Sequence, residues 1–304
     1  MPLPYRWQRR FERIKSEFGG LFGSGGQQPR PRICPACGSL VGINSTRCHE
    51  CGTSLTFSMA AISKKLGLMT GSTAPVTTVL LMANFLMFAV TLMMTMQEGK
   101  AGGLAILWGL GGEPTIRLGM SLPIRFVVGL NQWWRLVTAM FLHGGLLHIG
   151  LNMMSLYQLG PIVEEVYGSA RYLFVYVLCG AFGFLCSSYT NHYSLGASGA
   201  LLGLVGVLLA LTYKRGGGFM MQLRTQLISS TVMLFAIGIF GGFAIDNWAH
   251  GGGLAAGFLV GRIFRDREPS TKSEQSVAHL LGWFGALLTL ACFILMMIHF
   301  RDRY

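Results

Sequence analysis

Charge is what this sequence has least of: only 12% of its 304 residues are Asp, Glu, Lys or Arg. Soluble domains carry about 25% charged residues, so half of the usual solvating charge is missing and an ordinary soluble domain is excluded. Hydrophobic residues make up 52% of the chain, and several apolar runs reach the roughly 20 residues that span a bilayer core. We therefore predict an all-α polytopic membrane protein.

Acidic residues are scarcer than basic ones, with 12 Asp and Glu against 24 Lys and Arg. No stripe of base-stacking aromatic residues accompanies the basic charge, so no nucleic-acid partner is expected. Many of the basic residues precede the first apolar run, and the positive-inside bias then places the N-terminus in the cytoplasm. The first 60 residues also lack a short apolar core, so no cleavable signal peptide is expected.

The chain divides into a polar N-terminal part and a long apolar part. The predicted segments are a basic amphipathic tail and linker at 1–32, a zinc ribbon at 33–56, a linker at 57–74, a six-span core at 75–265, and a linker with a seventh span at 266–304. The expected spans lie at about 75–96, 136–163, 171–189, 196–213, 224–244, 245–263 and 278–299. This topology puts 18 of the 24 Lys and Arg inside and makes the C-terminus external.

The stretch between the first two spans, residues 97–133, has apolar pieces too short to cross a bilayer. Gly and Pro punctuate both pieces, at 104–110 and 122–130. An interfacial or half-inserted loop on the outer side is therefore expected.

Two matching knuckles with paired cysteines lie in the N-terminal part. Their cysteines are Cys34, Cys37, Cys48 and Cys51, and a glycine follows each pair. Four thiolates in this spacing suit tetrahedral Zn²⁺, and so short a segment needs the metal to fold. Two disulfides are the alternative, but a reducing cytoplasm disfavours them. The sequence predicts a closed, structural zinc site and leaves open a cytoplasmic protein partner for it.

Polar side chains are costly inside a bilayer, so those within the apolar runs are the first candidates for function. With the N-terminus inside, the second, fourth and sixth spans run inward and carry such groups near their outer ends: His143, His148 and Asn152; Ser198; and His250. At 1.5 Å rise per residue, these groups lie at nearly the same depth. We expect three parallel helices to bring them together.

Small residues share the helix faces of the serine and the histidine. Four glycines follow these two residues at helical spacing: Gly199, Gly203, Gly253 and Gly257. Small residues let transmembrane backbones approach closely, as a Ser–His hydrogen bond of about 2.6–3.2 Å requires. A packing seam alone would explain the glycines, but not a histidine among them.

The groups available fit nucleophilic catalysis. Ser198 heads its helix after Gly196, in a turn that exposes the hydroxyl at the positive end of the helix dipole. His148 and Asn152 lie one turn apart on one face, and both can donate to a developing oxyanion. His250 can take the serine proton and return it to a leaving amine, so no catalytic cofactor is expected.

Taken together, these motifs resemble the rhomboid intramembrane serine proteases. The resemblance covers roughly residues 75–265 in the family's order and is carried by Trp134-Arg135, by His143, His148 and Asn152, by Gly196-Ala197-Ser198-Gly199, and by Ala249-His250 with Gly253. It implies that Ser198 and His250 form a catalytic dyad. It also implies that His148, Asn152 and the Ser198 amide are oxyanion donors.

The resemblance has further implications outside the dyad. The segment carrying Trp134 and Arg135 corresponds to the family's membrane-embedded first loop, and Glu164 or Glu165 to its structural acidic residue. The seventh span resembles the form of the family with one helix added at the C-terminus. The substrates implied are single-span membrane proteins, cleaved near the outer face of the plasma (inner) membrane.

Two positions raise questions about the histidine. Many rhomboids have an aromatic residue one turn after the serine, stacked on the imidazole, whereas this chain has Leu202 there. Asp246 lies four residues before His250 and serves either as a helix cap or as a third catalytic member, the cap being preferred.

Three other functions would require sequence features that this chain does not have. An inactive relative that binds transmembrane helices would normally lack the serine or the histidine, and both are present. A transporter would show a repeat of broken helices and polar groups near the midplane. A metalloprotease would need His-Glu-x-x-His on one helix face, and no such spacing occurs.

Overall fold

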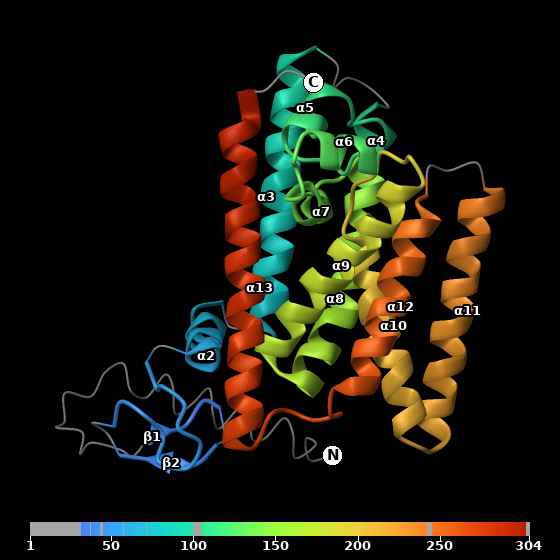
Figure 1. Ribbon diagram of the computed structural model, residues 1–304. Helices are drawn as coiled ribbons and strands as arrows, with labels where there is room; N and C mark the ends of the chain where they lie inside the picture. Colours follow the sequence, from blue (N-terminus) through green and yellow to red (C-terminus); the bar gives the residue numbers. More distant parts are fainter. Residues whose placement is uncertain are drawn as a thin grey trace, which may run out of the picture.

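The computed structural model describes residues 32–36, 38–42, 45–56, 58–70, 72–99, 105–241 and 245–301. The predicted amphipathic tail and Cys37 lie outside these residues, apart from Arg32 at the end of the tail. Seven long helices run side by side (Figure 1). They are α3 (Pro75–Gln97), α8 (Leu146–Tyr167), α9 (Ser169–Tyr189), α10 (Ser198–Lys214), α11 (Gly218–Phe240), α12 (Asn247–Ile263) and α13 (Lys272–Ile298).

Shorter elements flank this bundle at its two ends. At one end lie α4 (Ala105–Trp108), α5 (Glu113–Arg117), α6 (Ile124–Gly129), α7 (Arg135–Thr138) and η1 (Ala139–Phe141), with η2 (His299–Arg301) following α13. At the other end lie α2 (Met59–Thr70) and the antiparallel pair β1 (Arg32–Ile33) and β2 (Leu40–Val41).

Length and composition allow four of the described helices to cross a membrane: α3, α9, α11 and the helix from Lys272 to Arg301. A bent pair, 135–141 with 146–167, brings the number to five if it forms one span. α10 is apolar but shorter, at 17 residues. The prediction of an all-α integral membrane protein is confirmed.

The prediction of one continuous second span at 136–163 is wrong. The chain bends by 94° between Phe141 and Leu146, so α8 begins ten residues later than expected. The consecutive glycines Gly144 and Gly145 explain the break, because glycine is among the poorest helix formers.

Arg135 holds the outer segment together from a fully buried position. Its Nε donates to Gln132 Oε1 at 2.6 Å, and its Nη1 donates to the carbonyl oxygens of Ile116 and Met120 at 2.7 and 3.0 Å. Its guanidinium also lies 4.7 Å from the ring centre of Trp134. A guanidinium is suited to this task because its donors point in fixed directions toward several carbonyl groups at once.

Glu164 ties the beginnings of two helices to the end of a third. Its carboxylate accepts from the backbone amides of Val76 and Thr77, at 3.0 and 2.9 Å, and from the hydroxyl groups of Thr77 and Ser169. These bonds satisfy amides at the start of α3 that have no partner within the helix. Of the two acidic residues considered, Glu164 therefore makes the structural contacts, while Glu165 is exposed.

Glycine lets α10 and α12 approach each other almost to backbone contact. A Cβ atom at Gly253 would lie 2.0 Å from the Gly199 carbonyl oxygen, and one at Gly257 would lie 1.9 Å from that of Gly203. No side chain fits between the two helices at these points. The first turns of the two helices are consequently held close together.

α13 contacts both ends of the bundle. At its start, the buried Gln275 side chain donates to the Ala36 carbonyl and accepts from the Thr53 hydroxyl, one partner beside each pair of cysteines. Toward its other end, the Phe293 ring packs edge-on against Phe141 of η1 at 5.3 Å. One helix thus links the ribbon to the outer segment.

Candidate functional site

Three helix N-termini converge around one serine. Ser198 is the first residue of α10, His250 lies in the first turns of α12, and His148 lies in the first turn of α8. Ser198 Oγ and His250 Nε2 are 2.7 Å apart. His250 is only 4% exposed, so this hydrogen bond is shielded from bulk solvent.

The turn before Ser198 needs glycine and is fixed by the outer segment. Gly196 has φ +123°, which L side chains rarely adopt, and its amide donates to the Ala139 carbonyl at 3.0 Å. Ser194, two residues earlier, exchanges two backbone hydrogen bonds with Ser121. These contacts hold the turn in the orientation that presents the serine hydroxyl to α12.

The ring of His148 faces this same turn. A Cβ atom at Gly196 would lie 2.6 Å from His148 Nε2, so only glycine leaves room for the imidazole. The backbone amide of Gly144 donates to His148 Nδ1 at 3.4 Å. Because Nδ1 accepts, the neutral ring carries its proton on Nε2, the atom that points at the turn.

Asn152 places a second donor beside His148. It lies one helical turn further along α8, and its Nδ2 is the group that a Cβ at Gly196 would meet at 3.6 Å. This amide nitrogen is buried and has no hydrogen-bond partner within the described part of the chain. Two N–H donors therefore point to one place next to Ser198, where an anionic oxygen would find partners.

Asp246 acts as a helix cap, as preferred from the sequence. Its Oδ1 accepts from the backbone amides of Trp248 and Ala249 at 3.1 and 2.9 Å, and its Oδ2 accepts from the Ser187 hydroxyl. The Nδ1 atom of His250 has no hydrogen-bond partner among the described residues. The contacts form a serine–histidine pair without a hydrogen-bonded carboxylate.

An aromatic contact to His250 escaped the sequence analysis. The Phe235 ring of α11 packs edge-on against the imidazole, with ring centres 6.2 Å apart and an angle of 77°. Leu202, the residue one turn after the serine, is buried but has no ring. No local motif could reveal Phe235, because it lies on another helix and 15 residues before the histidine in the sequence.

His143 lies beside His148, near the serine–histidine pair. It is fully buried, and its ring meets that of His148 edge-on at 5.1 Å between centres. Neither ring nitrogen has a hydrogen-bond partner among the residues that the structure describes. His143 therefore packs against the His148 ring.

A second cluster of reactive side chains lies in the ribbon. The thiols of Cys34, Cys48 and Cys51 are buried, and their sulfur atoms all lie within 4.8 Å of one another. The Sγ atoms of Cys34 and Cys51 are 3.7 Å apart. Gly38 and Gly52 follow the two knuckles with φ of +77° and +71°, and each amide donates back to the carbonyl of the first cysteine of its pair.

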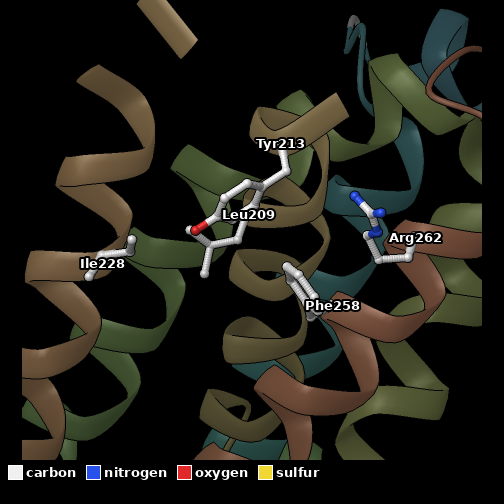
Figure 2. A pocket seen from close by; sticks show the side chains of 5 residues that line it. All are labelled: Leu209, Tyr213, Ile228, Phe258 and Arg262. Atoms are coloured by element: carbon white, nitrogen blue, oxygen red, sulfur yellow. The ribbon is translucent and has the colours of Figure 1, made fainter. Parts of the chain in front are cut away.

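A hollow of about 460 Å³ lies between α10, α11 and α12 (Figure 2). Its walls are formed by Leu209, Tyr213, Ile228, Phe258 and Arg262. Tyr213 is near the end of α10, about 22 Å from Ser198 along the helix at 1.5 Å per residue. The hollow is thus separate from the serine–histidine pair.

Comparison with known sequences gives one consistent family. A family profile described as Rhomboid domain matches residues 130–267, which contain Ser198, His250, His148 and Asn152. Named similar proteins include "Rhomboid protease GluP" of Bacillus subtilis (strain 168), 37% identical over 138 residues, and "RHOMBOID-like protein 1" of Arabidopsis thaliana, 32% identical over 190 residues.

The matched regions differ in how much of each protein they cover. The match to GluP covers 44% of this chain but 26% of GluP, and the match to the Arabidopsis protein covers 56% and 48%. YdcA, also of Bacillus subtilis (strain 168), is 35% identical over 144 residues, which is 44% of this chain and 68% of YdcA. The chain thus spans a quarter to a half of some relatives and about two thirds of another.

Proposed function

The chain belongs to the rhomboid family, and from this we propose that it is an intramembrane serine endopeptidase that cleaves transmembrane helices of other membrane proteins. The observation that carries the proposal is the 2.7 Å separation between Ser198 Oγ and His250 Nε2 within a helical membrane protein. A serine hydroxyl is a weak nucleophile, and an imidazole at this distance is the general base that activates it.

In the proposed reaction, Ser198 Oγ attacks the carbonyl carbon of a substrate peptide bond while its proton passes to His250 Nε2. The tetrahedral intermediate collapses as the imidazolium returns that proton to the leaving amine, which leaves an acyl group on the serine. Water then repeats the sequence with His250 as base, releasing the acid and restoring the hydroxyl. No metal or cofactor is needed for any of these steps.

We propose that the substrate oxygen, when it becomes anionic, is bound by His148 Nε2, Asn152 Nδ2 and the backbone amide of Ser198. The first two groups are N–H donors that face the turn at Gly196, and the third lies at the start of α10, where helix amides lack internal partners. Donors fixed in place before the reaction stabilise the transition state without further reorganisation.

For the setting, we propose single-span membrane proteins as substrates and cleavage near the outer face of the plasma (inner) membrane. Most of the basic residues lie on the side that the positive-inside bias assigns to the cytoplasm, together with the ribbon. The N-terminus would then be cytoplasmic and the C-terminus external. The serine–histidine pair lies toward the other end of the bundle from the ribbon (Figure 1).

We further propose that the ribbon binds one structural Zn²⁺ through Cys34, Cys37, Cys48 and Cys51. A tetrahedral ion with Zn–S bonds of about 2.3 Å separates its sulfur ligands by about 3.8 Å. The 3.7 Å between the Cys34 and Cys51 sulfur atoms fits that geometry. The small β1–β2 pair supplies too little apolar surface to fold alone, so the ion would contribute the folding energy of this segment.

A fluorophosphonate probe tests the proposed catalysis, because it reacts covalently with an activated serine. The full chain, purified in detergent, should be labelled, and both Ser198→Ala and His250→Ala should abolish labelling. Ser155→Ala is the matched control, because Ser155 donates only to the Leu151 carbonyl of its own helix. Labelling that persists in Ser198→Ala would rule out this nucleophile, and an unlabelled but helix-binding wild type would identify a non-catalytic relative.

A further inference from the structure

Among the residues that the structure describes, none forms a hydrogen bond with the second nitrogen of the His250 ring. A general base accepts the serine proton at Nε2, so in the proposed chemistry the neutral ring carries its own proton on Nδ1. Nδ1 has no partner among the described residues. In a Ser–His–Asp triad a carboxylate holds this proton and thereby orients the ring. Asp246 does not take that part, because its oxygens accept from two amides of its own helix and from Ser187. Packing must therefore hold the imidazole.

Phe235 makes the packing contact. Its ring meets the imidazole edge-on, with 6.2 Å between centres, which is within the range in which aromatic pairs attract. A Cβ atom at Gly251 would lie 3.9 Å from two carbons of the Phe235 ring, so the ring extends over the backbone beside the histidine. Leu202 has no ring to offer, and the aromatic partner of the base comes from α11 instead.

One hydrogen bond fixes the position of Phe235 along α11 relative to the start of α12. The side-chain amide of Asn247, the first residue of α12, donates to the Phe235 carbonyl at 3.2 Å. Gly238, one turn further along α11, leaves room for that side chain, because a Cβ there would lie 2.5 Å from Asn247 Oδ1. The Asn247 side chain at the start of α12 thus packs against Gly238 of α11, next to the contact between Phe235 and His250.

The rest of α11 is held weakly. Leu227 is the one buried residue among those of α11, and half of the apolar side chains of this helix are exposed. An element with few buried contacts moves at low free-energy cost. In the first half of α11, Arg224 donates to the Thr212 carbonyl of α10 at 2.6 Å. The contacts at Phe235 and Asn247 are those that hold the second half of α11 against α12.

We propose that Phe235 is a positioning residue that holds the His250 imidazole toward Ser198, and that seating of α11 against α12 thereby controls the reactivity of the base. When α11 is seated, the Phe235 ring confines the imidazole to the orientation that accepts the serine proton. When α11 moves away, the imidazole loses this support and turns from the hydroxyl. The inference rests on the serine–histidine chemistry proposed above.

The test compares variants of the full chain in detergent, with a transmembrane peptide substrate and with a fluorophosphonate probe. Phe235→Leu removes the ring, Phe235→Tyr retains it, and Phe240→Leu makes the same change on the exposed side of α11. We expect Phe235→Leu to lower kcat and the labelling rate roughly two- to tenfold, the effect of losing one aromatic pair. KM and the thermal unfolding temperature should stay near wild type, and the other two variants should react like wild type.

A double-mutant cycle tests the dependence on helix seating. Asn247→Ala releases the polar contact, and it should lower kcat by a similar factor. If both residues act through the position of α11, the double variant Phe235→Leu/Asn247→Ala should lose less kcat, relative to wild type, than the product of the two single losses. A loss equal to that product would mean that the two residues act independently and would contradict the dependence on helix seating.

The outcomes separate this inference from the proposed catalysis. Loss of labelling in Ser198→Ala together with an unchanged kcat in Phe235→Leu would overturn the role of Phe235 and leave the dyad standing. Equal losses in Phe235→Leu and Phe235→Tyr would also overturn it, because the ring would then not be what matters. Labelling that survives Ser198→Ala would instead remove the catalysis on which the inference depends.

Discussion

Gly257→Ala is the sharpest test of how α10 and α12 hold the site. The added Cβ would lie 1.9 Å from the Gly203 carbonyl oxygen and 2.6 Å from its carbon, and both are backbone atoms that cannot rotate aside. Restoring an ordinary contact of about 3.4 Å requires the helices to separate by about 1.5 Å at this point. Overpacking of this kind costs about 1–3 kcal/mol of folding free energy.

The same separation should reach the serine–histidine pair two turns away. Ser198 and His250 now lie within 2.7 Å, and a shift of about 1 Å takes them beyond hydrogen-bond distance. Misplacement of reacting groups by 1 Å can cost about 100-fold in rate, so we expect a loss of that order in kcat and in fluorophosphonate labelling.

The matched control is Gly150→Ala in α8, where an added Cβ meets no atom within 4 Å. That variant should keep its activity and unfold at the wild-type temperature or slightly above, because alanine favours helix. Thermal unfolding by circular dichroism and labelling rates would be measured on both variants. A Gly257→Ala protein that labels and unfolds like wild type would refute the argument from backbone contact.

Three further changes follow from the contacts described. Glu164→Gln should lower the free energy of unfolding by about 2–4 kcal/mol, because the new NH₂ group would face backbone N–H groups that now donate to the buried carboxylate. Glu165→Gln, at an exposed position, should leave thermal unfolding unchanged. Asn152→Ala should lower kcat by about 100–1,000-fold with little change in KM. Steady-state kinetics that show a KM effect alone would contradict a role of Asn152 in binding the oxyanion. Cys34→Ser should reduce bound zinc from one ion per chain to none, as measured by elemental analysis. A wild-type protein that folds without metal would contradict the proposed zinc site.

The sequence predicted most of what covalent spacing and helical geometry determine. The alignment of His148, Ser198 and His250 at one depth followed from span direction and residue rise, and the close approach of α10 and α12 followed from the glycine spacing. The bend before α8 was missed because residues 136–141 are apolar enough to continue a span, and hydropathy alone does not register a change of direction.

The packing around His250 could not be predicted in the same way. Asp246 was identified as a cap because capping is a local property, readable from the residues around a helix start. Phe235 approaches His250 from a separate helix, and its contact depends on the packing of α11 against α12. The choice between Glu164 and Glu165 could not be predicted either. Glu164 accepts hydrogen bonds from the start of α3, and the sequence of α8 does not say where α3 lies.

The shortness of α10 has a consequence for the surrounding lipid. Its 17 residues extend about 26 Å, less than the roughly 30 Å of a bilayer core. A lipid-exposed helix of that length would create a hydrophobic mismatch, and the membrane would thin around it. α10, however, is buried along nearly its whole length, so acyl chains do not meet it. The neighbouring helices, not lipid, cover α10, so its short length costs the surrounding membrane no thinning.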